Sequence, residues 1–298
     1  MCDNIKRAAA LGYFDGLHLA HIKVLEAALS QKENGLTPLV PLFDEAPSKV
    51  IAGVEAPRLM SAADRDRVLE KMGFEVVKLH FCDIRDMEPE QFVSEVLKEK
   101  LNVSFVSCGY NYSFGKNGTG NTRTLRKLCE KYEINLHVCR QVRLNGETVS
   151  STAVRNAVKS GDIEKANGML GRPLSFVSTV LPGEKRGRLL GFPTVNQLLP
   201  EGFIVPKCGV YASIAEFCGQ RLPAVTDIGS RPTFNASGVR SETHIMDFSG
   251  DLYGKEVRIS LIGYIREEKK FPSAESLIEQ IRADASKAAY MVSASNYF

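Results

Sequence analysis

No apolar run in the sequence approaches the roughly 18 consecutive residues that a membrane-spanning helix needs. The apolar stretch at residues 8–11 is too short for the core of a signal peptide. Seven cysteines are present, and none form a Cys-x-x-Cys pair, which argues against a disulfide framework and a structural zinc site. We therefore expect a cytoplasmic protein without a membrane partner, whose cysteines are small core residues.

A strong excess of charge is also missing. The chain has 38 Lys and Arg against 35 Asp and Glu, so its formal net charge is only +3. Nucleic-acid-binding domains usually combine an isoelectric point above about 9 with clustered basic residues, so we expect no nucleic-acid partner. The local cluster of Lys185, Arg186 and Arg188 fits a small anionic ligand better. We expect small-molecule substrates and a monomer or weak homo-oligomer.

The length of 298 residues favours two domains. Residues 5–165 alternate between strand and helix patterns, which predicts a parallel sheet with helical crossovers. Strands are predicted at residues 8–14, 39–43, 76–81, 105–108 and 135–142, and helices at 19–30, 62–72, 88–100, 122–132, 150–159 and 162–171. Because Gly171 and Pro173 form a helix stop, we place the domain boundary there, with domains at 1–170 and 171–298.

The second half shows a different pattern, with short strands separated by turns that contain Pro and Gly. Its strands are predicted at residues 176–181, 209–216, 245–248 and 256–264. No long helix intervenes until Ser273, which is placed to cap a terminal helix through residue 289. This order predicts a small antiparallel β-barrel followed by a helix. The fold class is therefore α/β followed by β.

The densest group of chemically active residues lies at residues 183–196. Glycines let backbone N–H groups approach a ligand closely, and Arg and Lys neutralise phosphate oxygens. A rigid proline beside Thr194 and Asn196 indicates oxygen ligands for a hard cation such as Mg²⁺. A phosphoryl-transfer site needs these parts; the alternative is a basic turn on a solvated surface. The candidate nucleotide-binding residues here are Gly183, Arg186, Gly187, Arg188, Gly191 and Pro193, and the candidate metal ligands are Thr194 and Asn196.

A second phosphate-binding pattern follows the first predicted strand. His18 and His21 are three residues apart at the start of a helix, so they share one face. The helix N-terminus adds N–H groups and the positive end of its dipole. Two imidazoles there can stabilise charge that develops on leaving pyrophosphate; the alternative is that His18 caps the helix and His21 faces water. The other candidate residues of this segment are Gly12, Phe14, Asp15 and Gly16.

Two further segments fit such a site. Ser151, Thr152 and Arg155 put hydroxyl groups at a helix start and an arginine one turn later, which suits phosphate; ordinary helix capping is the alternative. Asn111 lies in an aromatic loop after a predicted strand. That loop suits a planar ring, with simple packing as the alternative.

In the second half, Glu242 is the best candidate for a general base. It alternates with apolar positions in the segment 241–248, so it can project into the barrel or a site. A positioned base contributes about 10²–10⁴-fold to a rate. The alternatives are that Glu242 faces water and that Asp247 is the base.

The segments 12–21, 183–196 and 241–248, in this order, resemble the prokaryotic bifunctional riboflavin kinase/FAD synthetase family over almost the whole chain. The resemblance implies a Rossmann-like nucleotidylyltransferase domain followed by a riboflavin kinase barrel. It implies Mg²⁺- and ATP-dependent phosphorylation of riboflavin to FMN by the second domain, and adenylylation of FMN to FAD with pyrophosphate release by the first. The resemblance implies that ATP is bound and adenylyl transfer assisted by His18, His21, Asn111, Ser151, Thr152 and Arg155. It also implies that the Mg²⁺ ion of the kinase is bound by Thr194 and Asn196.

The same resemblance suggests flavin contacts in the second domain. Arg266 matches a family segment and is a candidate for contact with nucleotide or flavin, although a solvated charge run is an equal alternative. Phe203 and Tyr211 are candidates to flank the isoalloxazine ring, although aromatic residues in a small barrel are more often core.

The chain departs from the family pattern at two positions. Ala20 stands where the family usually has a glycine between its two histidines, and Ala46 stands where it usually has a histidine. An alternative is therefore a riboflavin kinase whose first domain is inactive or adenylylates another phosphate ester. A non-catalytic flavin carrier is a further alternative, and Thr194, Asn196 and Glu242 argue against it.

Overall fold

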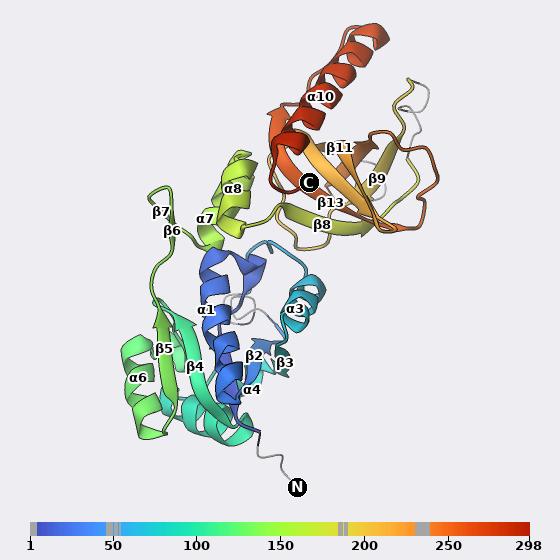
Figure 1. Ribbon diagram of the computed structural model, residues 1–298. Helices are drawn as coiled ribbons and strands as arrows, with labels where there is room; N and C mark the ends of the chain where they lie inside the picture. Colours follow the sequence, from blue (N-terminus) through green and yellow to red (C-terminus); the bar gives the residue numbers. More distant parts are fainter. Residues whose placement is uncertain are drawn as a thin grey trace. The chain divides into compact units, whose positions relative to one another are not determined.

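The computed structural model describes residues 5–45, 50, 53, 55–183, 187, 190–229 and 239–298. The chain divides into two compact units, Met1–Ala56 with Ala62–Ser150, and Pro57–Ser61 with Ser151–Phe298 (Figure 1). In this division the two helices before residue 171 group with the second unit. The domain boundary at residues 170 and 171 stays a prediction.

The first unit is built on a five-stranded parallel sheet with the order β3-β2-β1-β4-β5. The strands are β1 (Arg7–Leu11), β2 (Thr37–Phe43), β3 (Glu75–Leu79), β4 (Val103–Gly109) and β5 (Asn135–Cys139). The helices are η1 (Asp15–Leu17), α1 (Leu19–Leu29), η2 (Ser30–Asn34), α3 (Ala62–Lys71), α4 (Phe81–Ile84), α5 (Pro89–Gln91), η3 (Phe92–Lys100), η4 (Lys116–Gly118) and α6 (Thr122–Lys131). A small hairpin of β6 (Arg143–Leu144) and β7 (Glu147–Thr148) completes the unit. The predicted parallel sheet with helical crossovers is confirmed.

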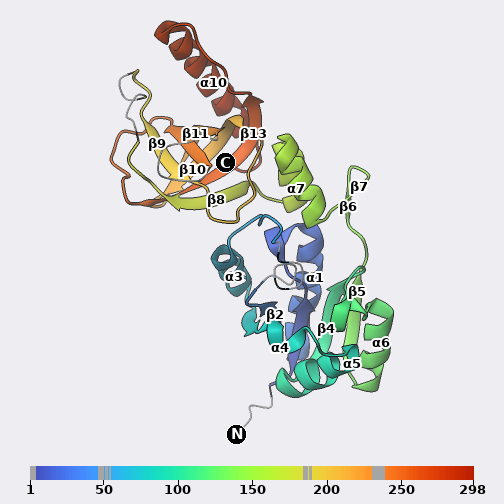
Figure 2. The ribbon, with the colours of Figure 1, turned by 180° about the vertical axis from the view of Figure 1, so that it is seen from behind.

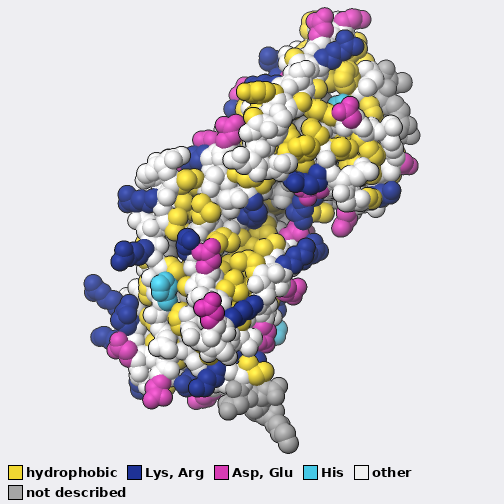
Figure 3. All heavy atoms as spheres, in the orientation of Figure 1, with side chains coloured by type: hydrophobic (Ala, Val, Ile, Leu, Met, Phe, Trp, Pro, Cys, Tyr) yellow, Lys and Arg dark blue, Asp and Glu magenta, His cyan; other side chains and the backbone are white. Residues whose placement is uncertain are grey.

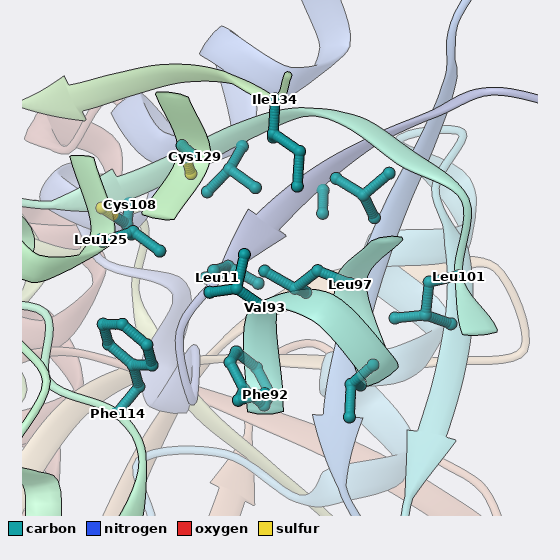
Figure 4. Close-up of a cluster of buried hydrophobic side chains, with 14 of the residues drawn as sticks. Leu11, Phe92, Val93, Leu97, Leu101, Cys108, Phe114, Leu125, Cys129 and Ile134 are labelled. Carbon is teal, nitrogen blue, oxygen red and sulfur yellow. The ribbon is translucent and has the colours of Figure 1, made fainter. Parts of the chain in front are cut away.

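Helices cover both faces of this sheet, and its central strands are largely buried as a result. On one face, Leu11 of β1 packs with Val93 and Leu97 of η3 and Leu125 of α6 (Figure 4). On the other face, the buried Ser107 of β4 donates a 2.8 Å hydrogen bond to a carbonyl of α1. Ligands of such sheets bind at the carboxyl ends of the strands, near the point where the strand order reverses. Here that point lies between β1 and β4.

The second unit contains a six-stranded antiparallel sheet with the order β8-β13-β10-β11-β12-β9. The strands are β8 (Leu174–Thr179), β9 (Thr194–Leu198), β10 (Gly209–Phe217), β11 (Gln220–Gly229), β12 (Arg240–Ile245) and β13 (Glu256–Arg266), and the helices are α7 (Ser151–Ser160), α8 (Ile163–Leu170) and α10 (Ala274–Ala294). Figure 2 shows the curl of this sheet from behind. α10 packs on β10 and β11.

The curl brings the two edges of the sheet together. The Leu181 amide, just after β8, donates a 2.8 Å hydrogen bond to the carbonyl of Asn196 on β9. The side chain of Gln197 donates a 2.6 Å bond to the carbonyl of Ser178. This confirms the predicted antiparallel, barrel-like second half. The predicted strand at 245–248 is wrong, because Ile245 ends β12 and Asp247 has a left-handed φ of 54° that turns the chain.

None of the helices that the structure describes is both long and apolar enough to cross a membrane. On the face shown in Figure 3, acidic and basic side chains are interspersed over the described surface. This surface agrees with the small net charge of the sequence.

Candidate functional site

The predicted kinase residues come together in the register of two neighbouring strands. Asn196 of β9 pairs directly with Glu242 of β12, and Thr194 pairs with His244. Because side chains alternate along a strand, Thr194 and Asn196 share one face with Glu242. The Cβ atoms of such direct pairs lie about 4.5–5.5 Å apart. The hydroxyl, the amide and the carboxylate are therefore close neighbours.

The opposite face of these strands is the barrel interior. Gln197, Ser241 and Thr243 alternate with the candidate residues and are at most 1% exposed. Thr194, Asn196 and Glu242 are half-buried. Glu242 therefore lies on the face of the sheet away from the barrel interior, and its role as a base stays a prediction.

Asp227 of β11 is a residue that the sequence interpretation missed. It pairs directly with Glu242, so a row of Asn196, Glu242 and Asp227 crosses three strands on one face. In the sequence, the alternation of polar and apolar residues along β11 could have pointed to Asp227, but this strand was not predicted. The row adds a second carboxylate beside the candidate base.

The glycine-rich segment packs closely against β9. A Cβ atom at Gly183 would lie 2.3 Å from Nδ2 of Asn196, and one at Gly187 would lie 2.4 Å from the carbonyl oxygen of Phe192. Only glycine permits this approach of the backbone. Gly191 has a φ of 85°, which glycine also favours. Arg186 and Arg188 lie outside the described residues.

Pro193 is fixed at the start of β9 by a histidine. Nδ1 of His244 is 2.9 Å from the carbonyl oxygen of Pro193, and the His244 ring meets the ring of Phe192 edge-on at 5.4 Å. These contacts hold the peptide that leads into Thr194. His244 therefore has a structural contact beside the candidate site.

A pocket of about 230 Å³, open to solvent, adjoins Thr194 and Pro193. Its lining mixes aliphatic, aromatic and hydroxyl side chains, which suits a planar ring with polar substituents. The lining residues are Val180, Pro193, Thr194, Val195, Thr243, Ile245, Phe248, Ser249, Gly250, Asp251, Leu252 and Tyr253.

The residues beside this pocket fit a hard divalent cation. Thr194 and Asn196 offer a hydroxyl and an amide oxygen, which are ligands that Mg²⁺ accepts together with substrate phosphates. The close approach of Gly183 leaves room for backbone N–H groups, but not for a side chain, next to Asn196. Within the described parts of the chain, no three His, Cys, Asp or Glu side chains form a metal-binding cluster. Thr194 and Asn196 would offer a cation here two neutral oxygens.

In the first unit, the chain turns sharply between β1 and α1. Phe14, Gly16 and Leu17 all have a positive φ, of 57°, 78° and 45°. Such strained backbone persists where the surrounding structure holds it, and it concentrates at ligand sites. Asp15 and His18 are each only 4% exposed. At Gly12, a Cβ atom would lie 3.1 Å from the Phe14 ring.

The two histidines of this turn stack on each other. Nδ1 of His18 accepts a 3.3 Å hydrogen bond from the His21 amide and so caps α1. The two rings are 3.6 Å apart and 14° from parallel, and the Phe14 ring meets His21 edge-on at 5.2 Å. His18 therefore caps the helix, as one interpretation predicted, and the cap also fixes both imidazoles at the helix N-terminus.

Arg65 of α3 supports this turn, although nothing distinguishes it from the other charged residues of its helix in the sequence. It is only 5% exposed. Its Nη1 donates a 3.1 Å hydrogen bond to the carbonyl of Tyr13, and its guanidinium lies 5.4 Å from the centre of the Tyr13 ring. A buried arginine thus fixes the peptide directly before Phe14.

The remaining residues of the predicted adenylylating site are divided between the units. Asn111 follows β4 in the first unit, where its Oδ1 would lie 3.3 Å from a Cβ atom at Gly109. Ser151, Thr152 and Arg155 begin α7 in the second unit, and Nε of Arg155 donates a 2.7 Å hydrogen bond to the carbonyl of Pro57. A shared role for the two groups stays a prediction.

The three candidate flavin contacts are all engaged within the second unit. Arg266 makes a bidentate ion pair with Asp284 of α10, at 2.8–3.1 Å. Tyr211 is fully buried and its hydroxyl donates to the carbonyl of Lys207; burial raises its pKa. Phe203 is 6% exposed and lies 5.9 Å from the ring of Phe176. Contact of these residues with flavin stays a prediction.

Comparison with known proteins gives a consistent result for both halves. A family model for FAD synthetase matches residues 2–153, and a model for riboflavin kinase matches residues 170–292. The bifunctional riboflavin kinase/FMN adenylyltransferases of Bacillus subtilis and Listeria monocytogenes are each 34% identical to the chain. The alignment covers 96% of this chain and 92% of the Bacillus protein, and 94% and 91% for the Listeria protein.

One solved structure shares the fold over the whole chain. It is described as a macrolide-efflux protein from Streptococcus pneumoniae, with 27% identity and a TM-score of 0.88. The match covers 96% of this chain and 94% of that one.

Proposed function

The chain belongs to the bifunctional riboflavin kinase/FMN adenylyltransferase family, and we propose that it makes FAD from riboflavin in two steps. In the first step, ATP phosphorylates the 5′-hydroxyl of riboflavin to give FMN and ADP. In the second, AMP passes from another ATP to FMN, giving FAD and pyrophosphate. The family and its order of domains agree with the prediction from sequence.

The observation that carries the kinase step is the direct pairing of Asn196 with Glu242, next to Thr194 and Gly183. Glu242 takes the proton of the 5′-hydroxyl as that oxygen bonds to the γ-phosphorus, and the bond from this phosphorus to ADP breaks. Thr194 and Asn196 hold Mg²⁺, which supplies charge neutralisation for the ATP phosphates when bound. The backbone at Gly183 and Gly187, with Arg186, Arg188, Gly191 and Pro193, cradles those phosphates.

For the adenylyl step, the strained turn after β1 supports phosphate binding. His18 and His21 stabilise the charge that accumulates on pyrophosphate as it leaves. Asn111, Ser151, Thr152 and Arg155 position ATP, while Gly12, Phe14, Asp15 and Gly16 shape the turn. No side chain needs to form a covalent intermediate, so positioning and electrostatics supply the catalysis.

The pocket beside Thr194 provides room for a planar ring system next to the phosphoryl site. Arg266, Phe203 and Tyr211 remain proposed flavin contacts. We also propose that the enzyme works in the cytoplasm, as a monomer or weak homo-oligomer.

A chromatographic time course with riboflavin, ATP and Mg²⁺ tests both steps. FMN should rise first and then convert to FAD, with pyrophosphate released in step with FAD. FMN that accumulates without FAD would instead support a riboflavin kinase with an inactive or differently specific first unit. A protein that forms no FMN would contradict the kinase assignment.

A further inference from the structure

A hydrogen-bonded pair of titratable side chains, His80 and Asp44, lies outside both candidate sites. His80 is the first residue after β3, and Asp44 is the first after β2. The two strands are parallel neighbours that pair Phe43 with Leu79 (Figure 1). Carboxyl ends of parallel strands share one edge of a sheet. The pair therefore lies on the same edge as the turn that follows β1.

Backbone groups hold Asp44 in a fixed position. Its Oδ1 accepts hydrogen bonds from the amides of Phe81, at 3.1 Å, and Glu45, at 2.9 Å. The Phe81 amide, followed by the His80 side chain, holds the pKa of the Asp44 carboxyl below its ordinary value. The carboxylate is thus ionised at neutral pH and can only accept hydrogen bonds.

This carboxylate sets the orientation of the imidazole. Nδ1 of His80 lies 2.6 Å from Oδ2 of Asp44, so Nδ1 is the donor. The His80 side chain is 77% exposed, whereas that of Asp44 is 37% exposed. The arrangement leaves the imidazole presented to solvent on a fixed anchor. The other ring nitrogen, Nε2, lies on the side of the ring away from Asp44.

We propose that His80, oriented by Asp44, binds the phosphate of FMN during adenylyl transfer. This inference rests on the proposed function of the first unit. There, an oxygen of the FMN phosphate bonds to the α-phosphorus of ATP, while the bond from that phosphorus to pyrophosphate breaks. Two anionic groups must approach each other, so the acceptor phosphate needs a partner of its own that holds it in place.

The strand order places this partner on the acceptor side. β1 is central, β4 with Asn111 lies on one side of it, and β2 and β3 lie on the other. His18 and His21 follow β1 and are assigned to the ATP phosphates. β3 is two strand spacings, about 10 Å, from β1, a distance that a histidine side chain and its bound phosphate together span. His80 is therefore placed to hold an acceptor next to the ATP phosphates.

The test compares steady-state constants of FAD formation in the full-length protein. His80→Gln should raise KM for FMN about tenfold, the effect of losing one charge-assisted hydrogen bond, and leave KM for ATP and riboflavin phosphorylation unchanged. His80→Arg, which introduces a cationic hydrogen-bond donor, should recover part of the loss. His137→Gln is the matched control, because His137 is an exposed histidine of the same sheet and should change nothing.

Asp44 acts through His80, so it is a positioning residue with its own test. Asp44→Asn should raise KM for FMN with kcat retained, and it should add nothing in the His80→Gln background. An unchanged KM for FMN in both His80→Gln and Asp44→Asn would overturn the proposal. A rise in KM for ATP alone would assign the phosphate to ATP and overturn it too. Wild-type protein that forms FMN but no FAD would instead refute the adenylyltransferase function on which the inference rests.

Discussion

Asn196 of β9 and Glu242 of β12 are direct cross-strand partners, although 46 positions separate them in the sequence. Their pairing sets the proposed metal-binding amide beside the proposed base without help from any loop. Strands in a curled sheet are rigid, so this geometry exists before a substrate binds. Reactions that depend on positioning gain most from such preorganisation.

Glu242→Gln should reduce kcat for riboflavin phosphorylation by about 10²–10⁴-fold, because glutamine cannot accept the hydroxyl proton. Adenylylation of added FMN should remain at the wild-type rate. Glu256→Gln is a suitable control, since Glu256 is an exposed residue at the start of β13. Stopped-time assays of each reaction separate the two steps. A Glu242→Gln enzyme with normal kinase turnover would rule out this base.

His18→Asn should lower FAD formation by about 10²–10³-fold. Asparagine is a good helix cap, so the variant keeps a cap on α1 while it loses the imidazole. His18→Ala should lose the same activity and, in addition, about 1 kcal/mol of stability. Pyrophosphate release measures the activity, and kinase turnover should not change. Normal pyrophosphate release from His18→Asn would leave His18 with a capping role alone.

Gly183→Ala should impair riboflavin phosphorylation and spare FMN adenylylation. The new methyl group would lie 2.3 Å from Nδ2 of Asn196, so the amide must move away from its position opposite Glu242. We expect a clear rise in the Mg²⁺ concentration that gives half-maximal rate. A Mg²⁺ titration at saturating ATP provides the measurement. An unaltered titration curve would show that Asn196 does not need this position.

Breaking the ion pair between Arg266 and Asp284 should destabilise the packing of α10 on the barrel. The side chains are 16% and 4% exposed, so Asp284→Ala leaves a buried, unpaired charge at a cost of about 3–5 kcal/mol. Hydrogen exchange of peptides from α10 measures this opening free energy locally. Glu26→Gln is the control, because its ion pair with Lys23 is exposed and contributes little to stability. Unchanged exchange in Asp284→Ala would contradict a stabilising role.

Thiol labelling of the native protein should distinguish buried from exposed cysteines. Burial raises the pKa of Cys108 to about 12, and that of Cys129 to about 11. A raised thiol pKa means that the reactive thiolate is nearly absent at pH 8 and forms only as the pH approaches those values. Cys82, Cys208 and Cys218 are exposed and should be alkylated first in peptide mapping by mass spectrometry. Rapid modification of Cys108 at pH 8 would show that its surroundings open.

Much of the fold could be predicted from the spacing of apolar residues along the sequence. Apolar runs alternating with helical patterns fixed the parallel sheet, and Gly171, with a φ of 71°, ends α8 where the helix stop was predicted. Ser273 caps α10 as expected. These features depend on neighbours within a few residues, so the local sequence contains the information that they need. The prediction failed at residues 245–248, where a left-handed Asp247 overrode the strand pattern.

The sequence by itself determined which residues are candidates for each site, because Gly183, Thr194, Asn196, His18 and His21 lie in compact motifs. The tertiary structure alone decided which distant residues join them. Asp227 reaches Glu242 through strand register, Arg65 reaches the turn at Phe14 from another helix, and His80 meets Asp44 across neighbouring strands. Register and helix packing come from the burial of whole faces, a cooperative property that no short stretch of sequence encodes.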